Sequence, residues 1–203
     1  MSICYIVGAG EFYGSFSPKS TDLVIAADGG YDTLLALNIK PTLILGDMDS
    51  VGAETEDIER LVFPVRKDET DSFLAYREGV RRGYTEFMLY GCTGGREDHT
   101  FANYALLVYA RTAGHKMTLI GERTETFAIK NETVTLSGKP LSHLSLFAYG
   151  GEAKGVSIIG AEYEARGVTL TPSFPLGASN RFKGCPVTVD IKDGILLIMT
   201  EKN

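Results

Sequence analysis

Residues 23–30 carry the sequence LVIAADGG, in which a short apolar run ends in an acidic residue and two glycines. The apolar run predicts a buried strand, and the turn residues begin where that strand ends. Similar runs predict strands at residues 3–7, 42–46, 61–65, 86–90 and 117–121, and amphipathic stretches predict helices at 69–82 and 98–112. This alternation is typical of βα units around a mostly parallel sheet.

In each predicted helix the apolar side chains recur at helical spacing, so we expect them to cover the sheet. They are Phe73, Tyr76 and Val80 in the first helix, and Phe101, Tyr104, Ala105 and Val108 in the second. After about residue 123 the pattern changes to alternating runs separated by glycine-rich turns, which predicts an antiparallel β-domain. Within it, the Asp193-Gly194 turn predicts a hairpin between residues 187–191 and 195–199. We therefore expect two domains, at residues 1–123 and 124–203.

Composition excludes several classes of protein. The 203 residues are 44% apolar, enough to bury a large core, and the formal net charge is −6. An acidic chain is a poor candidate for binding nucleic acid, which favours a basic face. The beginning of the chain has no basic segment followed by a long apolar one, so we expect no signal peptide, no membrane span and a cytoplasmic location. Three widely spaced cysteines predict no disulfide framework.

Acidic residues gather in the loops that follow the predicted strands. These loops contain Asp28-Gly29-Gly30, Gly46-Asp47-Met48-Asp49-Ser50, Lys67-Asp68-Glu69-Thr70-Asp71 and Gly94-Gly95-Arg96-Glu97-Asp98-His99. The carboxyl ends of parallel strands meet at one edge of a sheet, where open α/β folds bind ligands. Carboxylates brought together there repel one another, and a bound cation such as Mg²⁺ offsets that repulsion while accepting substrate phosphates as further ligands. Asp47 and Asp49 suit this role.

Each of these residues also has a simpler interpretation. An aspartate after a strand often caps the next helix, and Gly29, Gly30, Gly94 and Gly95 can serve only to form turns. Alternatively, glycines at these places let a phosphate approach backbone N–H groups at the start of a helix. Arg96 offers donors to a phosphate or forms a surface salt bridge, and His99 orients a ligand or packs. Four such loops in succession favour a binding site over a set of unrelated caps.

The ordered set of these loops, together with Ser179-Asn180 near the C-terminus, resembles the motif set of thiamine pyrophosphokinases. The resemblance spans nearly the whole chain. It implies an N-terminal α/β domain that binds ATP and magnesium, a C-terminal β-sandwich that binds thiamine, and a homodimer whose interface helps form the thiamine site. It also implies transfer of the pyrophosphoryl group of ATP to the thiamine hydroxyl, giving thiamine diphosphate and AMP.

Site residues follow from the resemblance position by position. Asp47, Asp49 and Asp71 match acidic positions that bind Mg-ATP, and the catalytic candidates are Asp71, Asp98 and Asp49. The nucleotide-binding candidates are Asp28, Gly29, Gly30, Lys67, Gly94, Gly95, Arg96 and His99. Ser179 and Asn180 match the pair associated with thiamine. Family members often carry an aromatic residue, frequently tryptophan, before that pair; this chain has no tryptophan, and Leu170 is nearest that position.

The mechanism expected on this basis is in-line attack of the thiamine hydroxyl on the β-phosphorus of ATP, with Arg96 and backbone N–H groups stabilising the developing charge. Asp71 or Asp98 accepts the hydroxyl proton, and the sequence leaves both open. Two other functions compete with this one. Asp47-Met48-Asp49-Ser50-Val51 also resembles the nucleophile motif of haloacid-dehalogenase-like phosphohydrolases, with Asp47 becoming phosphorylated. A catalytically silent thiamine or nucleotide sensor of the same fold is the other.

Overall fold

The structure is a computed structural model that describes residues 2–46, 57–63 and 68–202. Its contacts divide the chain into two compact units, which are described separately. The first contains residues 1–106 and 114–122, and the second contains residues 107–113 and 123–203. Within the described ranges, no helix combines the length and the apolar character needed to cross a membrane.

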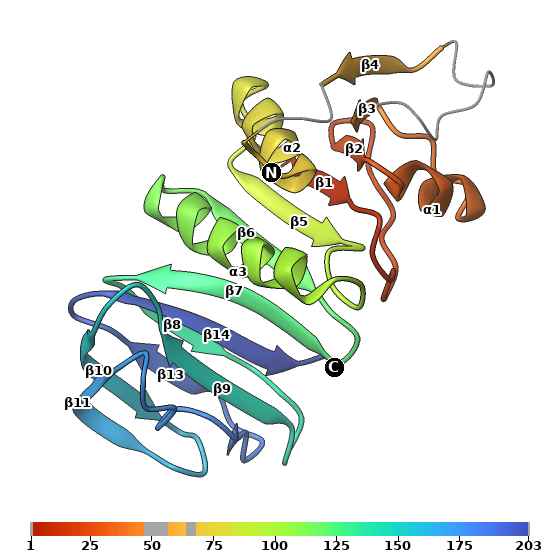
Figure 1. Cartoon of the computed structure of the whole chain (residues 1–203). Helices are drawn as coiled ribbons and strands as arrows, with labels where there is room; N and C mark the ends of the chain where they lie inside the picture. Colours follow the sequence, from red (N-terminus) through yellow and green to blue (C-terminus); the bar gives the residue numbers. More distant parts are fainter. Residues whose placement is uncertain (1, 47–56, 64–67, 203) are drawn as a thin grey trace. The chain divides into compact units, whose positions relative to one another are not determined.

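The first unit is an α/β domain built on parallel strands (Figure 1). Its elements are β1 (Cys4–Val7), β2 (Leu23–Ala27), α1 (Gly30–Ala36), β3 (Leu43–Gly46), β4 (Glu59–Val62), α2 (Asp71–Arg81), β5 (Glu86–Tyr90), α3 (Glu97–Thr112) and β6 (Lys116–Ile120). The last six residues of α3, 107–112, belong to the second unit. Every residue of β1, β2 and β3 is buried, as expected for strands covered on both faces. This confirms the predicted α/β class of the N-terminal part.

The order of these strands fixes where a ligand site can form. It runs β6-β5-β1-β2-β3-β4, and each neighbouring pair is parallel. The chain therefore moves from β1 through β2 and β3 to β4, and then crosses back to place β5 on the other side of β1. Loops that leave two such strands in opposite directions open a crevice at their carboxyl ends. Here the loops that follow β1 and β5 border that crevice.

The second unit is an antiparallel β-sandwich, which confirms the predicted class of the C-terminal part. Its strands are β7 (Thr124–Lys130), β8 (Thr133–Leu136), β9 (His143–Ala148), β10 (Ala153–Ile159), β11 (Ala165–Leu170), β12 (Asn180–Arg181), β13 (Val187–Asp190) and β14 (Ile195–Glu201). One layer has the order β12-β9-β14-β7 and the other β11-β10-β13-β8. Leu146 and Ile198 from the first layer and Val156 and Val189 from the second share one buried core.

The prediction of a hairpin around Asp193-Gly194 was wrong. β13 pairs with β8 and β10, whereas β14 pairs with β7 and β9, so the turn carries the chain from one layer of the sandwich to the other. Alternating apolar residues on two successive strands fit a hairpin and a layer crossing equally well. Gly194 has a φ of +113°, and a Cβ there would lie 2.6 Å from the Glu152 carbonyl oxygen, so the crossing requires glycine.

Both helices begin and end within two residues of the prediction, but their buried faces differ from it. In α2, Tyr76 is buried as expected, together with Leu74, Ala75, Glu78 and Gly79 instead of Phe73 and Val80. In α3 the buried side chains are Asn103, Leu106, Leu107 and Ala110. Phe101, predicted to cover the sheet, is 67% exposed. Apolar residues occur on more than one side of α3, and the face with the polar Asn103 is the one that packs.

Candidate functional site

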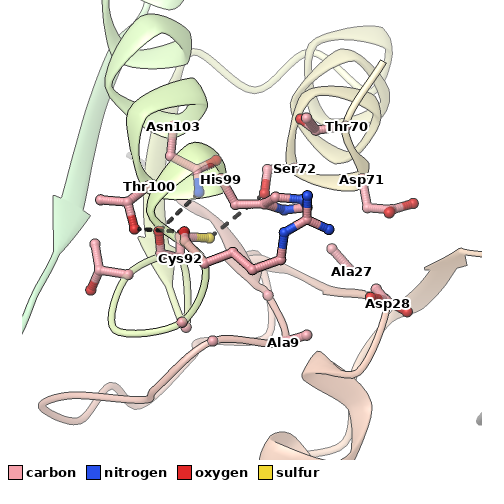
Figure 2. A pocket seen from close by; sticks show the side chains of 16 residues that line it. Ala9, Ala27, Asp28, Thr70, Asp71, Ser72, Cys92, His99, Thr100 and Asn103 are labelled. Carbon is pink, nitrogen blue, oxygen red and sulfur yellow. Dashed lines mark hydrogen bonds between the residues drawn. The ribbon is translucent and has the colours of Figure 1, made fainter. Parts of the chain in front are cut away.

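A pocket of about 380 Å³ lies at the carboxyl ends of the first unit's strands. Its wall is formed by residues 8–10, 27–28, 70–72, 91–93, 95–96, 99–100 and 103. These segments are the loops after β1, β2 and β5, the first turn of α2 and the first two turns of α3 (Figure 2). The pocket therefore occupies the crevice that the strand order creates.

The loops after β1 and β5 are joined by their backbones. The Gly8 N–H donates to the Tyr90 carbonyl at 2.8 Å, the Gly10 N–H to the Gly91 carbonyl at 2.7 Å, and the Glu11 N–H to the Thr93 carbonyl at 3.0 Å. We call this set of three bonds the loop ladder. It extends the pairing of β1 with β5 beyond the strands and holds one wall of the pocket rigid.

Glycines make the loop ladder possible. A Cβ on Gly10 would lie 2.6 Å from the Thr93 carbonyl oxygen, and one on Gly91, whose φ is +59°, would lie 2.4 Å from the Gly8 carbonyl oxygen. Side chains at these positions would force the loops apart. The sequence Gly8-Ala9-Gly10 is a weak signal by itself because it lacks the third glycine of the dinucleotide motif. The structure gives it a role as a pocket wall.

Two helices point their first turns at this pocket, and their unbonded N–H groups favour a negatively charged ligand there. Thr70 is the N-cap of α2, and its hydroxyl accepts a hydrogen bond from the Phe73 N–H at 3.3 Å. Asp71, the first residue of α2, is therefore not needed as the cap. The simpler interpretation of this aspartate, helix capping, does not apply to its side chain.

Both signs of charge line the pocket. Asp28 and Asp71 contribute carboxylates, and Arg96 and His99 contribute nitrogen donors. In Figure 2, Asp28 and Asp71 lie on the same side of the view, opposite Asn103 and Thr100. Asp28 has a φ of +53°, a conformation that a non-glycine residue adopts at some cost, and such residues concentrate at functional sites. A polyanion accompanied by a cation fits this mixture of charges better than either ion alone.

Arg96 and Asp98 form a bidentate ion pair. The Arg96 Nη2 lies 2.6 Å from Asp98 Oδ2, and Nε lies 3.1 Å from Oδ1, which also accepts the His99 N–H. The hydrogen bonds from Arg96 hold the pKa of Asp98 below its ordinary value. Arg96 lines the pocket, whereas Asp98 stands beside it and is exposed. A depressed pKa makes the Asp98 carboxylate a weaker base.

Replacement of Arg96 by glutamine is expected to raise the pKa of Asp98 toward the ordinary value of about 3.9, because the guanidinium stabilises the charged carboxylate. The change is measurable by NMR titration of the Asp98 carboxyl carbon. Arg111→Gln is the matched control, since Arg111 pairs with Glu132 instead. If the Asp98 pKa stays low in Arg96→Gln, the backbone N–H of His99 must account for the depression.

A polar contact connects α3 to the loop after β5. Asn103, which is buried, donates from Nδ2 to the Cys92 carbonyl at 2.9 Å. The Cys92 thiol lies 3.7 Å from the Ser72 hydroxyl, and burial raises the pKa of this thiol to about 11. Cys92 is therefore a neutral part of the wall and not a nucleophile. The predicted site did not include four of the lining residues, Thr70, Ser72, Cys92 and Asn103. Only their closeness in sequence to the acidic motifs could have indicated them.

The remaining predicted nucleotide-binding residues have different locations. Gly95 lines the pocket with Arg96 and His99, whereas Gly94 lines a second cavity beside it. Gly29 and Gly30 line neither, and Gly30 instead packs closely against β1, where a Cβ would lie 1.9 Å from the Val7 carbonyl oxygen. Lys67, Asp47 and Asp49 lie outside the described residues.

The described part of the pocket supplies oxygen donors suited to a magnesium ion. Asp28 and Asp71 provide carboxylates, the ligands that Mg²⁺ prefers, and Mg²⁺ typically uses one or two of them. Among the described residues, His, Cys, Asp and Glu form no group of three or more that could hold a metal. The two carboxylates fit an ion such as Mg²⁺, which also takes ligands from water and phosphate.

Ser179 and Asn180 belong to the second unit and have unlike environments. Ser179 is exposed with a φ of +61°, and its N–H donates to the Ser145 hydroxyl at 3.0 Å. Asn180 is buried, and its carboxamide bonds both backbone groups of Tyr163, accepting from the N–H at 3.0 Å and donating to the carbonyl at 2.7 Å. Tyr163 is thereby fixed while its side chain stays largely exposed, at 65%. Leu170 is buried at 3% exposure and offers no free face.

Comparison with known proteins gives concordant matches to both parts of the chain. The family model described as "Thiamin pyrophosphokinase, catalytic domain" matches residues 17–119, and the one described as "Thiamin pyrophosphokinase, vitamin B1 binding domain" matches residues 130–196. The thiamine pyrophosphokinase of Bacillus subtilis (strain 168) is 26% identical over 184 residues, which cover 87% of this chain and 86% of the relative.

Solved structures show the same fold. The crystal structure of thiamine pyrophosphokinase from Bacillus subtilis has a TM-score of 0.88 against this chain at 22% identity, with 99% of each chain covered. That of thiamin pyrophosphokinase from Geobacillus thermodenitrificans has a TM-score of 0.86 at 24% identity, with 99% of this chain and 98% of the other covered. The similarity extends over both units.

Proposed function

Because the chain belongs to the thiamin pyrophosphokinase family, we propose that it transfers the pyrophosphoryl group of ATP to the hydroxyl of thiamine, giving thiamine diphosphate and AMP. The observation that carries this proposal is the pocket bordered by the loops after β1 and β5 and by the first turns of α2 and α3. There, two helix N-termini and Arg96 suit a phosphate chain, and Asp28 and Asp71 suit the cation that accompanies it.

Catalysis in this site rests on position and charge. The loop ladder and the first turns of α2 and α3 hold the phosphate chain so that the β-phosphorus faces the incoming hydroxyl in line. Arg96 stabilises the charge that develops on the phosphate oxygens, after exchanging part of its bond to Asp98 for the ligand. Asp71 accepts the hydroxyl proton, because it lines the pocket and Asp98 does not.

Magnesium is the proposed cofactor. When bound, it neutralises the phosphates of ATP and polarises them toward attack. The proposed magnesium ligands are Asp47, Asp49 and Asp71. Of these, Asp71 belongs to the part of the chain that the structure describes, and it lines the pocket together with Asp28. Lys67 is proposed to contact the nucleotide.

We assign nucleotide binding and catalysis to residues 1–123 and thiamine binding and dimerisation to residues 124–203. The match of residues 130–196 to a vitamin B1 binding domain supports the second assignment. Ser179 contacts thiamine through its exposed hydroxyl, and Asn180 acts by holding Tyr163 in place. Sedimentation velocity tests the homodimer, which predicts a mass twice that of the 22.0 kDa chain.

Tyr163 supplies the aromatic face that the family resemblance places near the serine-asparagine pair, a role that Leu170 cannot take because it is buried. Tyr163→Leu is expected to raise the KM for thiamine about fivefold, because stacking of a cationic ring on the tyrosine contributes about 1 kcal/mol. The KM for ATP should change less than twofold. Tyr163→Trp retains a flat face and should restore the wild-type KM; failure of that rescue would argue against stacking.

The reaction is tested directly by incubating the protein with Mg-ATP and thiamine and separating the products by chromatography. Equal amounts of AMP and thiamine diphosphate are expected. ADP or free phosphate in place of AMP would reject pyrophosphoryl transfer, and a phosphorylated Asp47 would support a phosphohydrolase instead. Calorimetric binding of thiamine and ATP without turnover would indicate a sensor.

A further inference from the structure

Asn103 is a buried polar residue in the wall of the first unit's pocket. It lies on the second turn of α3 and is 5% exposed. In Figure 2 its side chain points from the helix toward Cys92. Its Nδ2 donates to the Cys92 carbonyl at 2.9 Å, and this bond fixes the orientation of the carboxamide, because only the nitrogen can donate to a carbonyl oxygen. The Oδ1 atom of Asn103 therefore faces away from that carbonyl.

This Oδ1 atom is a hydrogen-bond acceptor without a protein partner. In the part of the chain that the structure describes, no N–H or O–H group donates to it. Among those same residues, the one enclosed side-chain nitrogen or oxygen that lacks a partner is the hydroxyl oxygen of Thr93. The Asn103 Oδ1 is therefore not enclosed, and it opens into the pocket that the residue lines. Buried polar groups are nearly always bonded, so an open acceptor here indicates a donor on the ligand.

The surroundings of Asn103 hold this acceptor in place. Its partner Cys92 follows Gly91, whose carbonyl belongs to the loop ladder. The Cys92 thiol donates to the Tyr90 carbonyl at 3.3 Å and lies 3.7 Å from the Ser72 hydroxyl. The carboxamide is thus attached to a rigid wall and does not turn to suit different ligands. A fixed, buried acceptor discriminates strongly against a ligand that lacks the matching donor, because the acceptor then stays unpaired.

The chemistry around Asn103 narrows the choice of ligand group. An ionised phosphate offers acceptors only, so it gains nothing from a carbonyl oxygen. Asp28 and Asp71, which suit the cation that accompanies the phosphates, lie opposite Asn103 in Figure 2. The wall that Asn103 contacts is uncharged, because burial keeps the Cys92 thiol neutral by raising its pKa. The nucleoside is the part of ATP that is uncharged and carries donors.

We infer that Asn103 is a specificity-determining residue that recognises the adenine base, with its Oδ1 atom accepting a hydrogen bond from the 6-amino group. This inference rests on the proposed function and deepens it, because it says how the pocket selects its nucleotide. The Cys92 carbonyl uses one of the two hydrogens on Nδ2, and the other is left for the adjacent ring nitrogen, N7. An asparagine carboxamide matches this pair of groups on adenine, whereas guanine presents an oxygen in place of the amino group.

Nucleotide analogues test the inference in the unaltered protein. Purine riboside triphosphate differs from ATP only by lacking the 6-amino group, so its kcat/KM should be about tenfold lower, because the buried acceptor loses its partner. GTP places an acceptor against Oδ1, and its kcat/KM should be lower by about a hundredfold or more. Equal kcat/KM values for ATP and purine riboside triphosphate would overturn the inference.

The variant Asn103→Leu tests whether this residue is the source of the discrimination. Leucine is of similar size and removes both polar groups, so the ratio of kcat/KM for ATP to that for purine riboside triphosphate should fall from about ten to near one. A role confined to supporting the Cys92 carbonyl would lower both values equally and leave the ratio at its wild-type value, which would contradict the inference. Loss of discrimination between ATP and 2′-deoxy-ATP instead would also contradict it, because Oδ1 would then accept from the ribose.

Ser72→Ala is the matched control for this variant. Ser72 also lines the pocket and contacts Cys92, but through the thiol. Whatever the rate of Ser72→Ala, it should keep the wild-type ratio between the two nucleotides. A ratio that fell equally in both variants would assign the discrimination to the shape of the wall and not to Asn103.

Calorimetry in the absence of thiamine separates the inference from the proposed function. With Mg²⁺ and an ATP analogue that has a methylene group between the α- and β-phosphates, the wild-type protein should bind about tenfold more tightly than Asn103→Leu. That result without formation of thiamine diphosphate from ATP would reject the proposed function and support the role of Asn103. Normal formation of thiamine diphosphate with equal binding of the analogue by both proteins would show that the inference alone is wrong. So would a loss of affinity in Asn103→Leu for thiamine and not for the analogue.

Discussion

Asp71→Asn is expected to lower the kcat for thiamine diphosphate formation about a thousandfold. The substitution removes the proposed base, worth about 10²- to 10⁴-fold, and weakens a proposed ligand of the metal. The fold should be retained, because Thr70 and not Asp71 caps α2. The loss of a negative charge from the first turn of a helix costs about 0.3–1 kcal/mol, which should lower the Tm by only a few degrees. Steady-state kinetics and calorimetry check the two effects.

Asp32→Asn is the matched control for this experiment. Asp32 also lies in the first turn of a helix, α1, but does not line the pocket. Its variant should keep the wild-type kcat and show a similarly small change in Tm. If Asp71→Asn retained more than a tenth of the wild-type kcat, Asp71 could not be the base, and Asp98 would return as the candidate.

Gly30→Ala is expected to destabilise the protein by about 3 kcal/mol or more, the upper end of what overpacking usually costs. The new Cβ would lie 1.9 Å from the Val7 carbonyl oxygen and 2.6 Å from the Val7 carbonyl carbon, so β1 and α1 would have to separate. For a chain of this size the Tm should fall by roughly 6–12 °C. Thermal unfolding monitored by circular dichroism measures it.

A variant of the neighbouring glycine, Gly29→Ala, is the control that distinguishes steric crowding at Gly30 from the general effect of replacing a glycine on stability. Gly29 has a φ of −61°, which any residue adopts, and a Cβ there would meet the Ala9 Cβ at 3.1 Å. Gly29→Ala should therefore be much milder than Gly30→Ala. Equal losses in the two variants would show that the close approach to Val7 does not matter.

Much of the fold can be predicted from the sequence because strands buried on both faces leave continuous apolar runs. The predicted strand at residues 23–27 and β2 have the same bounds, as do the predicted strand at 86–90 and β5. The predictions that were wrong concern which side of an element faces which neighbour. Phe101 was expected to be buried and Asn103 was not considered, because periodicity treats a polar residue as exposed. Asn103 is buried because its amide donates to the Cys92 carbonyl, and the position of that carbonyl depends on the tertiary structure.

The candidate site was predicted in part. Strand ends locate the loops, so these residues were expected near one another, and the structure places five of them around one pocket: Asp28, Asp71, Gly95, Arg96 and His99. The roles of glycines were less predictable, since the same residue type serves different needs. Gly30 allows a helix to approach a strand, whereas Gly10 and Gly91 allow two loops to bond to one another. Sequence patterns do not separate these cases, because the obstructing atom belongs to a distant residue.

The loop ladder can form only late in the synthesis of the first unit. Its two halves come from the beginning of the chain and from the segment after β5, so closure must wait until the ribosome has released residues well beyond β4. Contacts between segments so distant in sequence form slowly compared with local ones. A nascent chain that ends before α3 can contain several βα units and still lack a complete pocket.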